Sequence, residues 1–439
     1  MVRFLLVQKC LVFPLAALSC LVGNVSAQEQ VKPTTPVLPI TGKAQSALQE
    51  VERVMIEFMT TNTIPGGALA VAYQGRLVYE RGFGYAELGT TESPKVAVTP
   101  SSRFRIASIS KPLTAVAVLR LVQVGKLRLD AKVYDLLKPE PLGEEAVHPR
   151  FKQVTVLQLL QHRGGWNRDV GFDPMFRSHI IAAAVGRKGP AEPEDIIRYM
   201  VSRKPESVPG EFYSYSNFGY CLLGRIIEKV SGQSYEAYMR SAILKPLGLR
   251  GLALGRTREE QRLPLEVKYY GQDWRLARSV FAPQKGLSVR WQYGGFYLEA
   301  MDSHGAWISS AHDLLKFTCD LDDRANSRLL AQSSIETMLA RPPGLPGKAK
   351  NGALRPYFYA CGWAVHQRKN LTTWDHGGSL PGTTTKIMCR SDGIHWVVLL
   401  NSRHDSDGKR LHPDHVQSRI QAALSRVKSW PDVDMFRRP

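Results

Sequence analysis

The chain has 439 residues, of which 44% are hydrophobic and 22% are charged. This ordinary composition excludes an intrinsically disordered chain, a collagen, a disulfide-dense small scaffold and a polytopic membrane protein. The formal net charge of +19 favours polyanionic partners, but the sequence has no long Lys/Arg run and no zinc-finger spacing, so we expect no nucleic-acid partner. The length predicts two or three domains, or one domain with a large insertion.

The first segment, residues 1–27, has the pattern of a secretory signal peptide. Arg3 gives it a basic start, residues 10–23 are apolar, and small residues precede a cut after Ala27. The apolar stretch is too short to span a bilayer. We therefore expect cleavage and export to the periplasm or the exterior.

Two other outcomes stay open for this segment, namely lipidation of Cys20 and an uncleaved membrane anchor. Later segments lack a run long enough for a membrane span, so we expect no stable membrane insertion after cleavage. Residues 28–41 are rich in Pro and Thr and are predicted to form a linker.

The N-terminal part of the mature chain predicts a helix, a hairpin and a second helix. Residues 43–60 place apolar side chains at helical spacing, which indicates an amphipathic helix. Residues 67–73 and 76–85 predict two strands around the turn Gln74-Gly75. The dense apolar residues of 110–124 predict a buried helix.

The middle of the chain predicts helices over residues 222–230 and 235–244, whereas the C-terminal third predicts strands. The strand-like runs cover residues 357–367, 371–374, 383–390 and 396–402, and a last helix begins near Pro413.

This order predicts an α/β (α+β) fold in which one antiparallel sheet is built from both ends of the chain. Terminal helices cover the sheet, and the active site is expected in a cleft beside a helical insertion. The predicted parts are a split sheet domain (42–124 and 291–428), a helix-rich insertion (125–290) and a tail (429–439).

Four cysteines follow the signal segment: Cys221, Cys319, Cys361 and Cys389. Export permits disulfides, and the four allow three complete pairings. Cys361 and Cys389 are the first pair to test, and buried free thiols are the alternative. The spacing does not predict a zinc site.

The first chemical motif is Ser108-Ile109-Ser110-Lys111. A Ser and a Lys three residues apart at a helix start share one face, so the amine can stabilise an alkoxide or take the hydroxyl proton. The same spacing at Ser425 and Lys428 in the last helix has no partner motif and is interpreted as surface.

Two further motifs follow in the chain. In Tyr215-Ser216-Asn217 the phenol can move a proton and the amide can bind a carbonyl or the lysine. In His376-Gly377-Gly378-Ser379 the glycines allow a substrate backbone to lie along a strand, and the imidazole can hydrogen-bond the Tyr215 phenol.

The three motifs, in this order, resemble those of the serine hydrolases related to class C β-lactamases and D-alanyl-D-alanine carboxypeptidases. That family carries S-x-x-K, then Y-x-N, then K-T-G or H-x-G. The stretch around Ser108, from Val98 to Ala115, is similar to the family's nucleophile segment, and the resemblance covers residues 43–425. It implies a β-lactamase/transpeptidase-like fold with an antiparallel sheet flanked by N- and C-terminal helices plus a helical insertion domain.

The resemblance also implies residue roles. Ser108 would be acylated, Lys111 and Tyr215 would share the general base and acid work, and His376 would stand where many relatives have Lys. Asn217, Gly378 and Ser379 would bind substrate, with the oxyanion hole formed by the backbone N–H groups of Ser108 and Ser379. No metal and no cofactor are implied.

Gly377 departs from the family pattern, because a hydroxyl residue at that place helps to hold a substrate carboxylate in relatives. Arg163, Lys386 and Arg403 are candidate replacements, with solvated surface cations as the alternative interpretation. His162 is interpreted as structural, and Trp166 as either a cleft-rim or a core residue. The polar cluster from His404 to His415 is better explained as a helix start than as a metal site.

The sequence therefore predicts an exported serine hydrolase that acts through a Ser108 acyl-enzyme on esters, amides or D-amino-acid peptides. A carboxypeptidase or esterase fits better than a β-lactamase because of Gly377. The alternatives are a class C-like β-lactamase and a non-catalytic member that binds wall polymer. The expected partners are small-molecule or peptide substrates, with peptidoglycan among the candidates.

Overall fold

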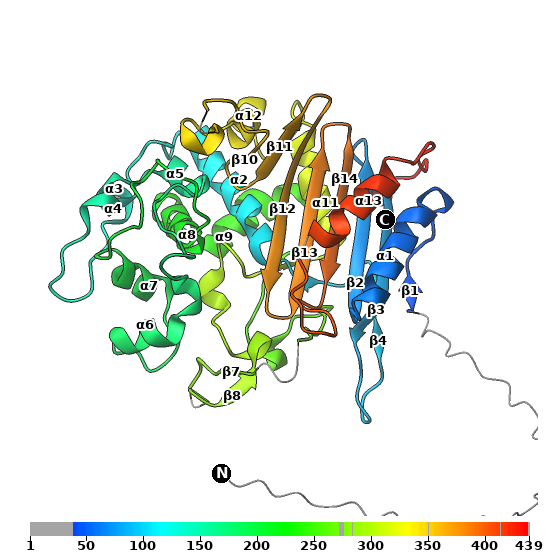
Figure 1. The fold of residues 1–439 in the computed structure, drawn as a ribbon, viewed down its shortest axis with the longest axis horizontal. Helices are drawn as coiled ribbons and strands as arrows, with labels where there is room; N and C mark the ends of the chain where they lie inside the picture. The colour runs from blue at the N-terminus through cyan, green and yellow to red at the C-terminus, as the bar shows by residue number, and fades with distance from the viewer. Residues whose placement is uncertain (1–37, 272–275, 283, 350, 413, 438–439) are drawn as a thin grey trace, which may run out of the picture. The chain divides into compact units, whose positions relative to one another are not determined.

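The computed structural model describes residues 38–437, apart from 272–275, 283, 350 and 413. Its main feature is an antiparallel sheet with strand order β1-β3-β2-β14-β13-β12-β11-β10, in which β4 also pairs with β3 (Figure 1). The strands are β1 (Ile40–Thr41), β2 (Gly66–Tyr73), β3 (Arg76–Glu87), β4 (Val96–Ala97), β10 (Tyr357–Tyr359), β11 (Ala364–Arg368), β12 (Leu371–Leu380), β13 (Thr383–Arg390) and β14 (Ile394–Leu400).

Helices precede, interrupt and follow the sheet strands. The α-helices are α1 (Gln49–Thr61), α2 (Ser110–Gln123), α3 (Val133–Leu137), α4 (Pro149–Gln153), α5 (Val156–Leu160), α6 (Ser178–Ala184), α7 (Pro193–Met200), α8 (Asn217–Ser231), α9 (Tyr235–Met239), α10 (Lys245–Leu247), α11 (Ala311–Asp322), α12 (Gln332–Leu339) and α13 (Asp414–Leu424). Two small sheets join β5 (Phe104–Arg105), β9 (Trp307–Ser309) and β6 (Ala253–Leu254), and β7 (Leu276–Arg278) with β8 (Ser288–Arg290). Among the described residues, no helix is both long and apolar enough to cross a membrane.

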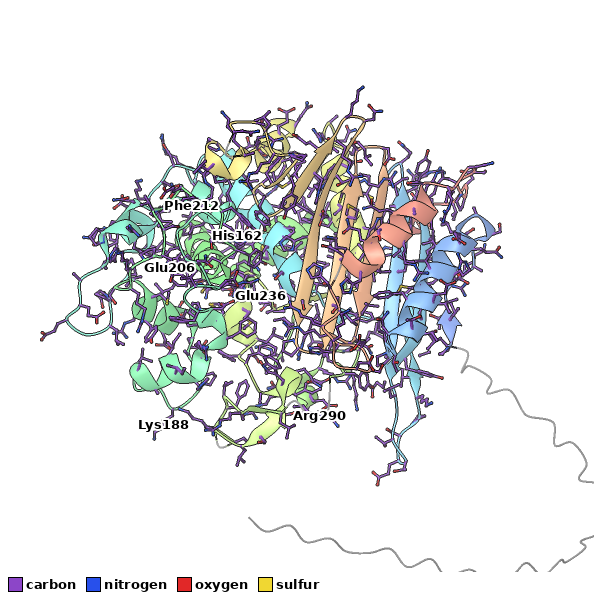
Figure 2. The ribbon with its side chains drawn as sticks, in the orientation of Figure 1. His162, Lys188, Glu206, Phe212, Glu236 and Arg290 are labelled. Carbon is purple, nitrogen blue, oxygen red and sulfur yellow. The ribbon has the colours of Figure 1, made fainter. Side chains whose placement is uncertain are left out.

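The central strand β2 shows how the sheet is buried on both faces. Its residues alternate, so that Leu69 and Val71 pack into the core with α1 and α13, whereas Ala68 and Ala70 pack into the opposite core with α2. Figure 1 shows α1 and α13 together on one side of the sheet and α2 on the other. Burial on both faces explains why this strand is apolar throughout rather than alternating with polar residues. Side chains fill the space between these layers (Figure 2).

The predicted fold class and the local elements of the N-terminal part are confirmed. β2 and β3 form the hairpin, and the turn residues Gln74 and Gly75 both have positive φ (51° and 73°), as a two-residue hairpin turn requires. The buried helix is α2, and the helix predicted over 222–230 lies within α8. The second predicted middle helix, 235–244, is α9 followed by a π-helical turn, η4 (Arg240–Leu244).

The C-terminal third differs from the prediction in two places. The single run 357–367 is two strands, β10 and β11, which reverse through a turn in which Gly362 has φ 83°. The run predicted over 371–374 continues as β12 to Leu380, through the glycines that indicated a loop. The glycines remain in the strand because Gly378 lies against another segment, as described below.

The predicted domain boundaries stay predictions, since contacts group Leu38–Pro439 as one unit. Strands from both ends of the chain do form one sheet, but part of the predicted helical insertion forms the short strands β6 to β8. The predicted signal peptide and most of the linker lie outside the described residues, while Ile40 and Thr41 at the end of that linker pair with β3. The four cysteines that follow residue 27 are buried free thiols, so Cys361 and Cys389 are not joined.

Candidate active site

Ser108 lies in a single 3₁₀ turn, η2 (Ala107–Ile109), directly before α2. The residue before it, Ala107, has φ 49°, which is a strained conformation for a residue with a side chain. The Ser110 hydroxyl donates to the Ala107 carbonyl at 2.7 Å and holds this turn. Ser108 itself is partly exposed, so its hydroxyl remains accessible.

The nucleophile turn is attached to the sheet. The hydroxyls of Thr383 and Thr385 on β13 donate to the carbonyls of Arg105 and Ile106 at 2.9 and 3.0 Å. A side chain at Gly378 on β12 would place its Cβ 2.2 Å from the Ile106 carbonyl oxygen. Glycine is therefore needed at this position for β12 to lie against the turn that carries Ser108.

Lys111, in the first turn of α2, is fully buried and has three neutral hydrogen-bond partners. Its Nζ lies 3.1 Å from Ser108 Oγ, 2.8 Å from Asn217 Oδ1 and 3.1 Å from the His304 carbonyl. Burial lowers the pKa of Lys111 well below its usual value, and the charge of Arg168 lowers it further. The neutral amine, the form that can accept a proton from Ser108, is therefore favoured.

Asn217 begins α8 and is oriented by a carboxylate that the sequence did not indicate. Its Nδ2 donates to Asp173 Oδ2 at 2.6 Å, which leaves its Oδ1 facing Lys111. Ser216 caps the helix by accepting from the Gly219 N–H. Burial raises the pKa of Asp173, an effect that the hydrogen bond from Asn217 opposes. Lys111, Asn217 and Asp173 thus form a continuous hydrogen-bonded chain.

Tyr215 lies beside both Ser108 and Lys111. The Lys111 Nζ is 4.8 Å from the centre of its ring. Burial raises the pKa of Tyr215, and contact with the Ser108 hydroxyl opposes the rise. The phenol therefore stays protonated in the resting site and can give a proton rather than take one.

His162 fixes the Tyr215 segment. Its carbonyl accepts from the Ser214 N–H at 2.8 Å and its Nδ1 accepts from the Ser216 N–H at 3.2 Å, so the two bonds bracket Tyr215. Its ring lies 4.2 Å from the Tyr215 ring, centre to centre. The structural interpretation of His162 agrees with these contacts, although the residue lies next to the site.

His376 lies in the cavity wall, but its hydrogen-bond partner is not Tyr215. Its Nε2 lies 3.0 Å from the Tyr359 hydroxyl, and its Nδ1 lies 2.8 Å from the Gly377 carbonyl, which can only accept. The ring is therefore neutral with its proton on Nδ1. Burial is the main cause that lowers the pKa of His376 to about 3. Because both ring nitrogens are engaged, the expected bond to the Tyr215 phenol is replaced by one from Tyr359.

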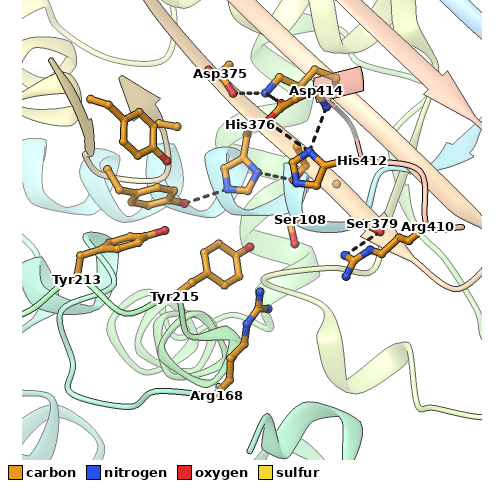
Figure 3. A pocket seen from close by; sticks show the side chains of 16 residues that line it. Ser108, Arg168, Tyr213, Tyr215, Asp375, His376, Ser379, Arg410, His412 and Asp414 are labelled. Atoms are coloured by element: carbon orange, nitrogen blue, oxygen red, sulfur yellow. Dashed lines mark hydrogen bonds and ion pairs between the residues drawn. The ribbon is translucent and has the colours of Figure 1, made fainter. Parts of the chain in front are cut away.

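These groups surround one cavity of about 280 Å³ (Figure 3). Ser108, Tyr215, His376, Gly378 and Ser379 all line it. Pairing of β11 with β12 ends at Asp375, so the His376–Leu380 part of β12 pairs only with β13 among the described strands. This free side of the strand is where the sequence predicted that a substrate backbone would lie.

Two of the three cations considered as carboxylate ligands are engaged elsewhere. Arg163 donates to the Gly210 carbonyl and to Gln161. Lys386 is buried and paired with Asp375 and with Asp414, the latter at 2.7 Å.

The third cation, Arg403, does reach the site, where its Nε donates to Ser379 Oγ at 3.1 Å. Arg410 donates to the same oxygen at 3.3 Å, and Arg168 lies over the Tyr215 ring at 4.7 Å. Figure 3 shows Arg168 and Arg410 facing the cavity near Ser108 and Ser379. Arg403 and Arg410 thus contact Ser379, whereas Arg168 lies beside Tyr215, and of these three the sequence indicated only Arg403.

Of the two positions considered for Trp166, the structure shows the core one. Trp166 is buried, with its ring 4.8 Å from that of Phe218 and 6.0 Å from that of Phe151. The described part of the chain holds no group of three His, Cys, Asp or Glu side chains arranged for a metal ion.

The sequence analysis missed Asp173, Tyr359, Arg168 and Arg410. Each is distant in sequence from the motif that it contacts, and none lies at a recognisable spacing. A short Asp173-Pro174 helix-start pattern was present, and Asp173 does accept from the Met175 N–H. That pattern predicts a helix cap and gives no indication of a contact with Asn217.

Comparisons with known proteins agree with this geometry. The Beta-lactamase family model matches residues 51–418. Protein flp of Staphylococcus aureus is 24% identical over 85% of this chain and 66% of its own length, and penicillin-binding protein 4* of Bacillus subtilis is 26% identical over 77% of this chain and 68% of its own length. The chain thus spans about two thirds of the length of these relatives.

Solved structures show the same fold. The octameric penicillin-binding protein homologue of Pyrococcus abyssi has a TM-score of 0.65 at 26% identity, covering 86% of this chain and 77% of its own. The D-amino acid amidase of Ochrobactrum anthropi has a TM-score of 0.66 at 20% identity, covering 88% of this chain and 100% of its own. The family match, the fold and the assembled motifs lead to one conclusion: the chain belongs to the β-lactamase family of serine hydrolases.

Proposed function

We propose that this protein hydrolyses esters, amides or D-amino-acid peptides through an acyl-enzyme on Ser108. The observation that carries the proposal is the position of Lys111, whose buried Nζ lies 3.1 Å from Ser108 Oγ with no carboxylate among its hydrogen-bond partners in the described residues. An amine in this setting loses its proton more easily than an exposed lysine and can act as a base near neutral pH.

Acylation starts when Lys111 takes the Ser108 proton and Oγ attacks the substrate carbonyl carbon. The backbone N–H groups of Ser108 and Ser379 stabilise the negative charge that develops on the carbonyl oxygen, a contribution worth about 3–4 kcal/mol per donor in comparable sites. The leaving oxygen or nitrogen takes the Tyr215 phenol proton as its bond to carbon breaks. Lys111 then returns a proton to Tyr215, and water repeats the sequence to release the acid.

The candidate substrates follow from the site and from the relatives together. One relative is named a penicillin-binding protein, and one structural neighbour is a D-amino acid amidase. A carboxypeptidase-like or esterase-like reaction fits these names, with peptidoglycan stems among the peptide candidates. Arg168 and Arg410 could hold a substrate carboxylate in place of the hydroxyl that Gly377 lacks.

The β-lactamase reaction is the second candidate, because the same residues could open a β-lactam ring. Arg403 and Arg410 at Ser379 Oγ favour it by offering a place for the β-lactam carboxylate. We also propose that residues 1–27 direct export, on the grounds of their sequence pattern alone, so that the reaction takes place in the periplasm or outside the cell.

Intact mass after brief exposure to a penicillin tests the proposal, with Ser108→Ala as the matched control. A stable adduct on the wild type alone supports the acyl-enzyme and the carboxypeptidase-like reaction. Consumption of the drug without an adduct favours the β-lactamase reaction. If neither is seen, turnover of p-nitrophenyl acetate decides: the proposal fails if Ser108→Ala is as active as the wild type, or if neither protein is active.

A further inference from the structure

A second, mostly aromatic cavity of about 260 Å³ opens beside the catalytic one. Three separate segments line it: the loop before α8, the turn η8 (Leu345–Gly347) and strand β10. The lining residues are Phe212, Tyr213, Leu345, Pro346, Arg355, Tyr357, Phe358 and Tyr359. Figure 2 labels Phe212 within the mainly helical part of the molecule. We refer to this cavity as the aromatic groove.

Four large side chains of the aromatic groove are unusually exposed. The relative exposure is 47% for Phe212, 42% for Tyr213, 47% for Leu345 and 46% for Tyr357. A single exposed apolar side chain is common on a protein surface, but several lining one cavity indicate a binding site. Covering them with a ligand would remove apolar surface from water, which favours binding.

The groove is continuous with the catalytic cavity. Tyr213, Tyr357 and Tyr359 line both cavities, and Ser108 lines the catalytic one. In Figure 3, Tyr213 lies on the opposite side of Ser108 from Ser379 and Arg410. The groove therefore begins at the tyrosine-lined end of the catalytic cavity, away from Arg410.

The floor of the groove is held in place by the catalytic wall. The Tyr359 hydroxyl is hydrogen-bonded to His376 at 3.0 Å, and its ring lies 5.7 Å from that of Tyr213. Phe358 is buried beneath Arg341, whose guanidinium lies 4.1 Å from the ring centre. A preformed floor costs little ordering when a ligand binds.

We propose that the aromatic groove is a specificity subsite that binds an aromatic or long aliphatic group of the substrate, next to the bond that Ser108 attacks. This inference rests on the proposed function. The substrate itself is the occupant, because the groove shares three tyrosines with the cavity of the nucleophile. Arg355 is the one charged side chain among the described residues that line the groove, so the groove favours uncharged groups over cationic ones.

The test uses two pairs of esters, because the apolar group could belong to either side of the bond. The acyl pair is p-nitrophenyl acetate and p-nitrophenyl 3-phenylpropanoate, and the leaving-group pair is phenyl acetate and 4-benzylphenyl acetate. In the wild type we expect kcat/KM of the larger ester to exceed that of the smaller one about tenfold or more in at least one pair, as apolar pockets commonly discriminate.

The double variant Phe212→Ala, Tyr357→Ala should remove most of that preference. Both residues are exposed, so truncation should leave the thermal midpoint within a few degrees of the wild-type value. If the midpoint of the double variant falls further, the size preference is measured in the two single variants instead. Val124→Ala is the matched control, since Val124 is also exposed (57%) but lies at the end of α2 and lines neither cavity. It should keep both the activity and the preference.

The possible outcomes separate this inference from the proposed function. Ser108-dependent turnover without a size preference, or with a preference that the double variant keeps, overturns the subsite and leaves the hydrolase intact. A change of oligomeric state in the double variant, without a change of preference, would assign the groove to contact between copies of the chain instead. If no ester is turned over, the subsite inference fails, and the penicillin mass measurement decides the proposed function separately.

Discussion

Two buried lysines lie near the same cavity and differ in what surrounds them. Lys111 on α2 is fully buried, and its hydrogen-bond partners in the described part of the chain are a hydroxyl, an amide oxygen and a backbone carbonyl. Lys386 on β13 is 4% exposed and is held between the carboxylates of Asp375 and Asp414. Burial alone therefore does not decide what a lysine does.

The hydrogen-bond and ion-pair partners decide whether a buried lysine is a base or part of an ion pair. Neutral acceptors do not compensate the cost of burying an ammonium, so Lys111 is driven towards the free amine that a base requires. Carboxylates do compensate it, and the pair also affects Asp375: although burial opposes ionisation, His366 and Lys386 hold the pKa of Asp375 below its usual value. The α2 region is thus built for proton transfer, and the β13 region is built as an internal ion pair.

Replacing Lys111 should have the largest effect. Lys111→Met keeps most of the buried volume but removes the base, and we expect kcat to fall about 10³- to 10⁴-fold, the upper range for loss of a general base. The thermal midpoint should not decrease, because an uncompensated buried amine is removed. Steady-state kinetics with a calorimetric scan would check both, and a variant with more than a tenth of wild-type kcat would refute the assignment of Lys111 as base.

The matching change at Lys386 should have the opposite result, a loss of stability with little loss of activity. Lys386→Met leaves the buried Asp375 with His366 alone at 3.3 Å, so we expect a loss of about 3 kcal/mol in the free energy of unfolding. The folded fraction should retain activity within about tenfold. Urea denaturation measures the loss, and an unchanged midpoint would show that the ion pair does not stabilise the sheet.

The acid side of the pH–rate profile should respond to two residues near Lys111 in opposite directions. Arg168 lowers the pKa of Lys111 and Asp173 raises it. Because the base must be deprotonated, Arg168→Ala should move the acid limb of kcat/KM to higher pH, and Asp173→Asn should move it to lower pH, each by roughly one unit.

Opposite shifts would also show that Asp173 does more than hold Asn217, since a purely structural loss lowers the rate without moving the limb. The profile is best measured with a neutral ester, so that loss of a charge near the cavity does not alter substrate binding. Shifts of the same sign for the two variants would contradict the electrostatic explanation.

The last expected effect concerns His376, a third buried basic group, and is seen only on acidification. Its pKa of about 3 in the folded protein lies below the value of 6.5 that applies when the chain unfolds. The unfolded chain therefore binds one more proton between these values, and stability present above pH 6.5 is lost as the pH falls towards 3, by up to about 1.4 kcal/mol per pH unit. His376→Gln should flatten this dependence, as urea midpoints at pH 7, 5 and 4 would reveal.

The parts of the molecule that sequence predicts well are those specified by neighbouring residues. The β2–β3 hairpin follows from its turn residues, and α2 follows from a dense apolar run next to the Ser108 motif. The turn at Gly362 was missed because its reason is tertiary: a side chain there would lie 2.7 Å from Ala115 on α2. The continuation of β12 through Gly378 was missed for the same kind of reason.

The active site also has a part that the sequence predicts and a part that it does not. Ser108, Lys111, Tyr215 and Asn217 were predicted together, and the structure brings them together around Lys111. The partners that orient them are set by contacts between segments far apart in the chain. Asn217 and Asp173 are 44 residues apart, and no spacing rule links two residues at that distance.

The threonine contacts from β13 to the nucleophile turn also determine when the active site can exist during synthesis. Thr383 and Thr385 follow the turn by 278 and 279 residues, and β14 must then insert between β13 and β2 to complete the sheet. A nascent chain that has released Ser108 but not these strands lacks the support for the strained Ala107 conformation. The ribosome must therefore synthesise almost the whole chain before the active site can form. Early truncation products are then inactive. Folding is slow, as it generally is when strands far apart in the sequence must pair.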